Sequence, residues 1–302
     1  MVLVTGITGK SGTWFLKRLI LEKESLKDVK FRVVARNSSN VELIDSSGLP
    51  IEKVYGDLND ASFIEKSMKN ISTVLHIAGI HTSLKVVEAA INNDVNRLIL
   101  VHTTGIYSKY KSASSEYIET EKRIEKIIAN RKIDVTILRP TMIYGSISDK
   151  NVIIFIKMVD KLRFLPIINH AKYPLQPVYE KDLGDAYYQV LINADTTRNK
   201  NYILSGKEPI LLIDMLKIIG NYLEKKNTFI SVPFPIAYIG ACVFYGLTIG
   251  KVDYREKVQR LIEPRTFPHD EASKDFGYSP VNFKEGVKKE IIDYVSKNTR
   301  KE

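Results

Sequence analysis

Cysteine, tryptophan and histidine are scarce in this chain of 302 residues, which contains one, one and five of them. The single cysteine, Cys242, excludes an internal disulfide framework and is typical of a protein in a reducing compartment. The histidines do not have the spacing of metal ligands, so we expect no metal site; they stand at positions 76, 81, 102, 170 and 269.

Acidic residues are the less common charge, with 35 Asp and Glu against 45 Lys and Arg, which gives a net charge of +10. Such an excess is compatible with nucleic acid, an anionic membrane or a phosphate-bearing ligand. The lysines are spread along the chain, and the only short basic cluster is "KNTRKE" at 297–302. Because basic and aromatic residues do not interleave, we expect no nucleic-acid partner and interpret the charge as a solvated surface plus local phosphate sites.

No charged residue occurs between positions 229 and 250, "FISVPFPIAYIGACVFYGLTIG". Pro233 and Pro235 interrupt its first part, and the remainder is shorter than the roughly 20 residues that span a bilayer. We predict a helix that is buried, packs at an interface, or contacts a membrane surface or another protein. The opening residues "MVLVTG" leave no room for a signal peptide, so we expect a cytoplasmic protein.

Short β-rich apolar runs alternate with helical periodicity in the first half of the chain. The runs "MVLVTG", "KFRVVAR", "STVLHIAG", "RLILVHTTG" and "DVTILRP" are typical of buried parallel strands. This alternation predicts an α/β fold with a doubly wound parallel sheet of the Rossmann type. A ligand is then expected beyond the carboxyl ends of the strands.

The alternation weakens after residue 145, which predicts a second, smaller and mostly helical C-terminal lobe. We assign residues 1–145 to a nucleotide-binding domain, to which residues 174–206 return. Residues 146–173 and 207–302 form the smaller, substrate-binding lobe in this prediction. The segment 151–168, "NVIIFIKMVDKLRFLPII", is expected to be a helix outside the first sheet.

A glycine-rich turn, "VTGITGKSG", connects the first predicted strand to the first helix. Gly6 permits a tight exit from the strand, Gly9 a close approach of backbone N–H groups to a pyrophosphate, and Gly12 close packing of helix on sheet. The helix N-terminus and the ammonium group of Lys10 favour an anion there. We therefore predict dinucleotide binding at this turn, with Thr8 and Ser11 as further contacts.

The G-x-x-G-x-x-G spacing and several later segments resemble the short-chain dehydrogenase/reductase superfamily, in particular its extended and atypical members. "TGITGKSG" is similar to the glycine turn of NmrA-like proteins, and "GDL", "IAG" and "LRPTMIYG" resemble elements that contact adenine, ribose and nicotinamide. The resemblance covers nearly the whole chain and implies an NAD(P) cofactor. Its expected contacts, beyond the glycine turn, are Asp57, Leu58, Ala78, Gly79, Thr103, Pro140, Met142 and Ile143.

The end of the second predicted strand indicates which nicotinamide cofactor is preferred. NAD binders place an acidic residue there, which accepts hydrogen bonds from the ribose 2′-hydroxyl. This chain has Arg36 followed by Asn37 and no acid. A guanidinium group would pair with a 2′-phosphate, so we predict NADP in preference to NAD.

The catalytic set that the resemblance implies is incomplete. The family uses a Ser or Thr, a Tyr and a Lys four residues after the Tyr, and Thr104 and Tyr117 match the first two. On a helix with about 100° per residue, Glu121 falls near 40° from Tyr117 and Lys122 near 140°. Glu121 therefore occupies the lysine position, where a carboxylate beside the phenol would raise its pKa.

Three interpretations of Tyr117 follow. It packs in the core without a chemical role; or it serves the substrate with another cation, Lys122, Lys109 or Lys111; or Tyr107, which has the four-residue spacing to Lys111, replaces it.

The sequence thus leaves two functions open. The first is an NADP(H)-binding oxidoreductase or epimerase/dehydratase-like enzyme acting by hydride transfer on a small polar molecule or sugar nucleotide, with Arg265 near a substrate diphosphate as in extended family members. The second is a catalytically degenerate NAD(P)-binding protein that acts as a redox sensor or assembly partner. The oligomeric state stays open, and a dimer is plausible.

Overall fold

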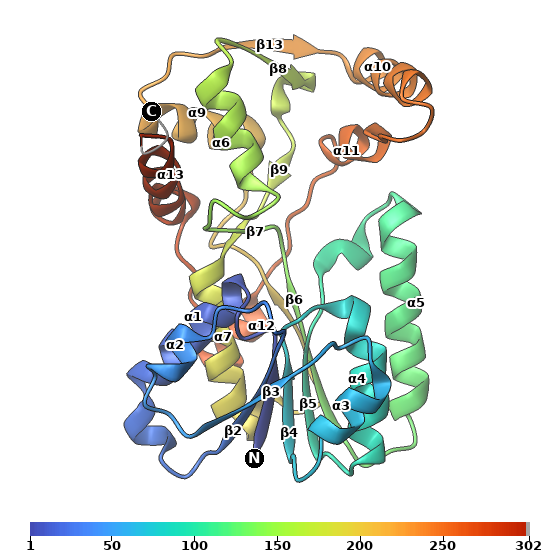
Figure 1. The fold of residues 1–302 in the computed structure, drawn as a ribbon. Coiled ribbons are helices and arrows are strands. Elements are labelled where there is room, and N and C mark those ends of the chain that lie inside the picture. The colour runs from blue at the N-terminus through green and yellow to red at the C-terminus, as the bar shows by residue number, and fades with distance from the viewer. Residues whose placement is uncertain (300–302) are drawn as a thin grey trace.

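A seven-stranded parallel sheet is the centre of the larger of two parts in the computed structural model (Figure 1). The structure describes residues 1–299, and for residues 111–113 and 299 it describes only the backbone. The strand order is β11-β6-β5-β4-β1-β2-β3, so the order reverses between β1 and β4, where ligands bind in folds of this kind. The strands are β1 (Val2–Thr5), β2 (Phe31–Ala35), β3 (Ile51–Tyr55), β4 (Thr73–His76), β5 (Arg97–Val101), β6 (Asp134–Pro140) and β11 (Asn201–Leu204).

Helices cover both faces of this sheet, which confirms the predicted doubly wound Rossmann-type fold. One face is covered by α3 (Ala61–Ser67), α4 (Ile80–Asn92) and α5 (Lys111–Ile128). The other is covered by α1 (Lys10–Leu21), α7 (Glu180–Ile192) and α12 (Asp270–Phe276). Strand side chains alternate between the two cores: Val4 packs on the α1 side and Leu3 on the α3 side. Short elements η1 (Lys23–Leu26), α2 (Glu42–Asp45) and α8 (Ala194–Thr197) lie in the connections.

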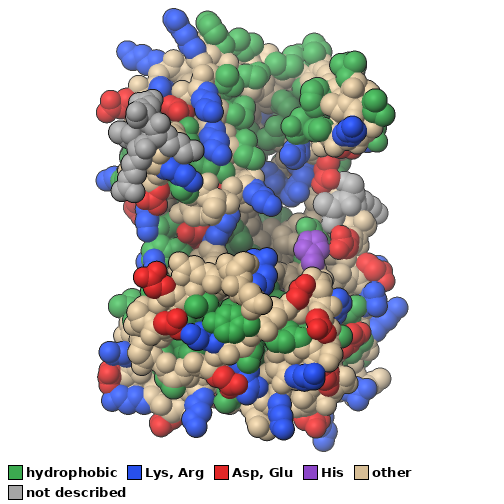
Figure 2. Space-filling model, in the orientation of Figure 1, with side chains coloured by type: hydrophobic (Ala, Val, Ile, Leu, Met, Phe, Trp, Pro, Cys, Tyr) green, Lys and Arg blue, Asp and Glu red, His purple; other side chains and the backbone are tan. Residues whose placement is uncertain are grey.

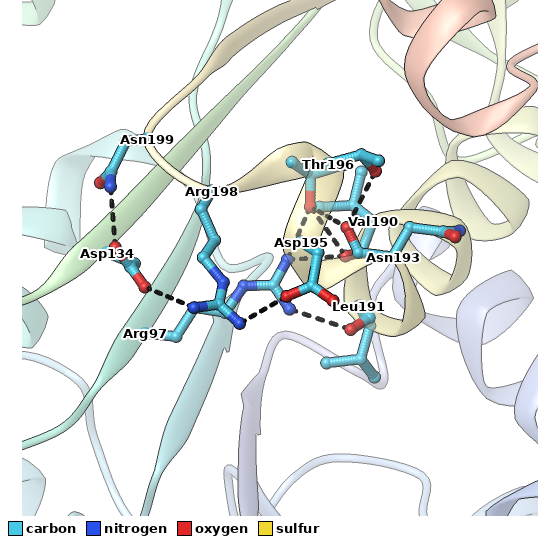
Figure 3. Close-up of polar contacts among 10 residues, drawn as sticks. Arg97, Asp134, Val190, Leu191, Asn193, Asp195, Thr196, Arg198 and Asn199 are labelled. Carbon is cyan, nitrogen blue, oxygen red and sulfur yellow. Dashed lines mark hydrogen bonds and ion pairs between the residues drawn. The ribbon is translucent and has the colours of Figure 1, made fainter.

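Arg97, the first residue of β5, ties the amino edge of the sheet to the end of α7 (Figure 3). Its buried guanidinium group donates to the carbonyl oxygens of Val190 at 2.7 Å and Leu191 at 2.9 Å and to Thr197 Oγ1 at 2.8 Å. The two carbonyls belong to the last turn of α7, where a cation is favoured. Arg97 is therefore a structural cap on the side of the sheet opposite to the glycine turn.

The smaller part lies at the other end of the molecule and has its own hydrophobic core (Figure 1). The helices α6 (Val152–Lys161), α9 (Leu212–Tyr222) and α13 (Phe283–Thr299) surround that core. Three two-stranded sheets accompany them in the described part of the chain, and the parallel pair of β8 (Phe164–Ile168) with β13 (Thr228–Val232) is the longest. The remaining elements are β7 (Ile143–Tyr144), η3 (Asn169–Ala171), β9 (Pro174–Leu175), β10 (Val178–Tyr179), β12 (Ile210–Leu211), α10 (Phe234–Leu247) and α11 (Arg255–Arg260).

Three local predictions differ from the structure. The expected helix over 151–168 ends at Lys161, and the rest is strand β8, because Pro166 cannot continue a helix. Within the range 207–302, α12 packs in the core of the sheet domain through Ala272 and Phe276. The third concerns the uncharged helix α10: of the alternatives predicted for it, the structure excludes only burial, since only Ala241 of its residues is buried.

No helix within residues 1–299 is both long enough and apolar enough to cross a membrane. The last residues of the predicted basic tail, 300–302, lie outside the described residues.

Candidate functional site

Two neighbouring clefts lie at the carboxyl edge of the sheet. The first is lined by the residues that follow β1, β2, β3 and β4. The second follows β5 and β6 and is closed on its far side by residues 260–267 of the smaller part. Figure 2 shows the hollow between the two parts, with basic side chains on the wall above it. Because β4 and β5 are adjacent strands, the two clefts are side by side.

The glycine turn has the geometry that a dinucleotide requires. Gly6 adopts a φ of +77°, and a Cβ there would lie 2.7 Å from the backbone nitrogen of Ala78. A Cβ on Gly12 would lie 2.1 Å from the carbonyl oxygen of Gly6, so the start of α1 packs directly on the turn. Gly9 precedes α1 without a capping side chain, which leaves N–H groups of the first helical turn for an anion. Thr8, Lys10 and Ser11, the further contacts predicted at this turn, line the same cleft.

The ends of β2 and β3 complete the first cleft. Arg36 is exposed and lines it together with Ser39, whose Oγ accepts from the backbone nitrogen of Arg36 at 3.1 Å. Asp57 and Leu58 also line it, and Asp57 Oδ1 accepts from the backbone nitrogen of Asn59 at 2.9 Å.

Of three further predicted cofactor contacts, Ala78, Gly79 and Asn37, only Ala78 lines this cleft. Ala78 lines it, and Gly79 stands just after β4 at the N-cap of α4 with a φ of +103°. Asn37 is exposed and is not one of the residues that line the cleft.

The strand-end hydroxyl groups lie in the second cleft, whose volume is about 310 Å³. Thr104 is buried, and its Oγ1 donates to the carbonyl oxygen of Pro140 at 3.2 Å. Thr103 Oγ1 accepts from the backbone nitrogen of Gly105 at 3.0 Å and caps the short helix η2 (Thr104–Tyr107). The predicted residues Thr103, Thr104, Pro140, Met142 and Ile143 all line this cleft.

Two arginines face these hydroxyl groups from the smaller part. Arg260 and Arg265 line the second cleft, and the Nε atom of each is buried without a hydrogen-bond partner in the described chain. Burial, followed by the charge of Arg260, lowers the pKa of Arg265 to about 10, so it stays charged at neutral pH. The nearby carboxylate of Glu263 accepts from Ser108 Oγ at 2.9 Å and from the backbone nitrogen of Lys109 at 2.7 Å.

The helical wheel predicted that the carboxylate of Glu121 lies beside the phenol of Tyr117. In the structure this carboxylate binds other side chains. It accepts from Arg139 Nη2 at 2.6 Å, from Arg139 Nε at 3.1 Å and from His102 Nδ1 at 2.8 Å. Burial acts to raise the pKa of Glu121, but these hydrogen bonds and the charge of Arg139 outweigh it, and the pKa is lowered. Position 121 thus faces the sheet, and Lys122 is exposed, as the wheel predicted.

Tyr117 lies beside the loop that carries the strand-end hydroxyl groups. Its ring is 5.4 Å from that of His81 in an edge-on arrangement, and its Cε2 is 3.3 Å from the position of a Cβ on Gly105. Tyr107 lines the second cleft and packs against Phe267 with ring centres 5.6 Å apart. The side chain of Lys111, the predicted partner of Tyr107, lies outside the described residues.

Sequence reasoning missed His102, Arg139, Arg260 and Glu263. Arg139 and His102 carried a signal, because each follows an apolar strand run and a charged or polar group in such a place needs a partner. Arg260 and Glu263 gave none, since they come from a distant segment of ordinary charged sequence.

The first half of the chain matches a known protein family. A family model described as NAD(P)H-binding matches residues 6–156. A UDP-glucose 4-epimerase from Vibrio cholerae is 23% identical over 336 aligned positions, which cover 99% of this chain and 97% of that protein. Subunit 9 of the mitochondrial NADH dehydrogenase [ubiquinone] 1 alpha subcomplex from Arabidopsis thaliana is 26% identical over 126 residues, 42% of this chain. The chain spans only 31% of the length of that curated relative.

Solved structures share the fold over almost the whole chain. A dTDP-glucose 4,6-dehydratase from Streptomyces venezuelae, solved with NAD, superposes with a TM-score of 0.74 at 16% identity and covers 99% of this chain and 98% of its own. A UDP-glucose 4-epimerase from Thermotoga maritima, solved with UDP-glucose, gives a TM-score of 0.72 at 17% identity and covers 98% of this chain and 99% of its own.

Proposed function

Because the chain belongs to the NAD(P)H-binding family and to the extended short-chain dehydrogenases/reductases, we propose that it is an NADP(H)-dependent oxidoreductase or epimerase/dehydratase-type enzyme. Its proposed substrate is a small polar molecule with a phosphate or diphosphate, such as a sugar nucleotide. One observation carries the proposal: the second cleft adjoins the glycine-turn cleft and is lined by Arg260 and Arg265, whose Nε atoms are buried without a hydrogen-bond partner in the described chain, together with the buried strand-end hydroxyl of Thr104. Arg260 has only a long ion pair, at 3.9 Å to Glu256.

The residues of the first cleft suit a dinucleotide phosphate. The N–H groups at the start of α1 and the ammonium group of Lys10 would hold the pyrophosphate. Arg36 would hold a 2′-phosphate, and no acid at the end of β2 is present to bind a 2′-hydroxyl instead. When bound, the nicotinamide supplies or accepts a hydride.

Thr104 and Tyr117 would then handle the substrate oxygen. The hydroxyl of Thr104 donates its proton to the carbonyl oxygen of Pro140. Its oxygen atom can therefore still accept a hydrogen bond from a substrate hydroxyl. The phenol of Tyr117 would exchange a proton with the same oxygen. Arg260 and Arg265 would bind the anionic end of the substrate, since a guanidinium group matches phosphate oxygens in a bidentate manner.

The ion pair between Glu121 and Arg139 supports the second candidate, a nucleotide-binding protein without turnover. Glu121 occupies the position of the family's catalytic lysine, and its carboxylate accepts two hydrogen bonds from Arg139 inside the fold. In that case the protein would sense the cofactor redox state or assemble with a partner. We propose a cytoplasmic location for either protein, and the single free cysteine, Cys242, supports a reducing compartment.

Nucleotide titration tests the proposal first. NADPH and NADH are titrated by calorimetry into the wild type and the Arg36→Ala variant. We expect the variant to lose about tenfold in affinity for NADPH, because a charge-assisted hydrogen bond contributes about 1.5 kcal/mol at the low end, while NADH binding stays the same. Equal affinity of the wild type for both nucleotides would contradict the NADP preference, and binding of neither would contradict the function.

Turnover separates the two candidates. Hydride transfer is followed as the change in NADPH absorbance or, for an epimerase, as product formed from UDP-glucose or dTDP-glucose. An active wild type, with a Tyr117→Phe variant at least 100-fold slower, would assign the proton transfer to Tyr117. Tyr107→Phe is the matched comparison, since Tyr107 lines the second cleft, and a loss of turnover in that variant alone would assign the proton transfer to Tyr107.

A further inference from the structure

One end of the smaller part faces away from the sheet (Figure 1). It carries exposed apolar side chains (Figure 2). We define this apolar end face by the outward residues of β8, β13, α10 and the turn after α10. They are Phe164, Pro166, Ile230, Ile236, Ile239, Val243, Phe244, Leu247 and Ile249. Apolar residues exposed singly are ordinary on a protein surface, but a contiguous group of this kind marks a binding surface.

The helix α10 presents a continuous apolar stripe to solvent. Ile236, Ile239, Val243 and Leu247 follow each other at intervals of three and four residues and therefore lie on one face. Their exposed fractions are 62%, 61%, 56% and 78%. The opposite face of α10, with Ala241, packs inward toward α11. Because α10 has no charged residue of its own, charged contacts with a partner surface would come from the basic residues of the neighbouring segments.

The two-stranded sheet beside α10 extends the same surface. Side chains alternate along β8, where Phe164 and Pro166 are exposed and Leu165 is buried. Ile230 of β13 pairs with Pro166 and is also exposed, so both strands turn apolar side chains outward. Figure 2 shows hydrophobic side chains gathered over this end, with Lys and Arg side chains at its margin.

The segments that form this surface carry charge of one sign, and the nearest acids, Asp160, Glu224 and Asp253, lie just beyond their ends. The segments 161–173 and 225–251, which contain β8, β13 and α10, have no Asp or Glu. They contain six basic residues, Lys161, Arg163, Lys172, Lys225, Lys226 and Lys251. Of these, only Lys225 forms an ion pair in the described part of the chain, with Asp160 at 3.1 Å. The others are free to meet negative charges outside the protein.

We propose that this apolar end face docks the protein on the surface of a lipid bilayer with anionic headgroups. Ile, Val, Leu and Phe side chains of α10 would enter the boundary between headgroups and acyl chains, while the basic margin would meet lipid phosphates. A helix of 14 residues is too short to span the bilayer, so the protein lies on the membrane and does not cross it. The charge favours lipid over a second copy of this chain, because two copies of the face would bring basic margins together.

This orientation would leave the nucleotide-binding part in solution. The glycine turn and the first cleft belong to the sheet domain at the opposite end of the molecule (Figure 1). Membrane docking by the apolar end face is therefore independent of any reaction at the clefts.

Vesicle flotation of the full chain tests the proposal. The wild type is mixed with vesicles of phosphatidylcholine alone and of phosphatidylcholine with 30% phosphatidylglycerol. We expect binding to the anionic vesicles, at least tenfold weaker binding for Ile239→Asp/Val243→Asp, and roughly fivefold weaker binding for each of Lys226→Gln and Lys251→Gln. Leu21→Asp is the matched control, since Leu21 is 77% exposed on α1 in the sheet domain, and it should bind like the wild type.

A fluorescent probe reports insertion directly. Because Cys242 is the only cysteine, the Cys242→Ser/Val243→Cys variant carries one label site in the exposed stripe. A nitrobenzoxadiazole label there should shift to the blue on anionic vesicles. Thermal melting and NADPH affinity of every variant should match the wild type, since the changed positions are exposed, or half-buried in the case of Cys242, and none of them lines either cleft.

Three results would overturn the proposal. The first is a wild type that binds neither vesicle, which would leave a protein partner for this face. The second is undiminished binding by Ile239→Asp/Val243→Asp. The third is a wild-type dimer in analytical ultracentrifugation that this variant converts to a monomer, which would make the face an interface between two copies.

Discussion

Replacing Glu121 by glutamine tests whether the lysine position of α5 has become a structural anchor. The carboxylate is 8% exposed and Arg139 is 7% exposed, and two hydrogen bonds of 2.6 Å and 3.1 Å join them. Removing one partner of such a buried pair costs about 3–5 kcal/mol, because the other charge stays buried without compensation. For 302 residues the entropy of unfolding is about 0.6 kcal/mol per kelvin, so Tm should fall by about 5–8 °C.

Scanning calorimetry between pH 3 and pH 8 measures this effect and its pH dependence. The pKa of Glu121 is lower in the folded protein, so its ionised form stabilises the fold above the unfolded value of about 4.3. That contribution is lost as the pH falls below about 4 and Glu121 is protonated. The difference in Tm between the wild type and Glu121→Gln should therefore be largest near neutral pH and shrink in acid.

A surface pair provides the control. Arg18 and Glu22 form an i, i+4 ion pair at 2.7 Å with both side chains 31% exposed, and Glu22→Gln should cost no more than about 1 kcal/mol. A Glu121→Gln variant that melts within 1 °C of the wild type at pH 7 would refute the assignment of an anchor. So would a Glu121→Lys variant that gained turnover, because a lysine there should meet Arg139 and destabilise the fold.

Three further predictions follow from the packing. Gly12→Ala should abolish measurable NADPH binding by calorimetry, because its Cβ would lie 2.1 Å from the backbone oxygen of Gly6, whereas Gly240→Ala has free space and should bind normally. Glu290→Gln should raise Tm, and by more at pH 8 than at pH 5. Burial, with Asp149 nearby, raises the pKa of Glu290 to about 10, so the folded state keeps a proton that the unfolded state releases above about 4.3. The wild type therefore loses stability as the pH rises, and glutamine, which does not titrate, removes this loss. Arg97→Met should lower the free energy of unfolding by about 1–3 kcal/mol in urea titration, because it removes three buried hydrogen bonds, although Val190 O keeps the hydroxyl of Thr197 as a donor.

The tyrosine helix illustrates why the fold was easier to predict than the chemistry. The spacing of Tyr117, Glu121 and Lys122 places the glutamate inward and the lysine outward, and the structure agrees. A helical wheel gives the direction of a side chain but not its partner. The sequence therefore placed the Glu121 carboxylate beside the phenol, while Arg139, 18 positions later, binds it instead.

The uncharged segment 229–250 is a second case in which the sequence predicted the element but not what surrounds it. Its composition excluded a membrane span by length and predicted a helix, and α10 is that helix. Apolar composition alone favours burial, yet α10 is mostly exposed. Whether an apolar helix is covered depends on which elements pack against it, and that is not a local property.

The sequence by itself determined the α/β class, the glycine turn and the strand ends that line the nucleotide cleft. These features depend on neighbouring residues: the period of two or 3.6 in apolar positions, and glycines where a Cβ would meet backbone. Only the tertiary structure decided the contents of the second cleft. Arg260, Glu263 and Arg265 reach the strand-end hydroxyl groups from more than 150 positions away, because the chain leaves the sheet, builds a second core and returns.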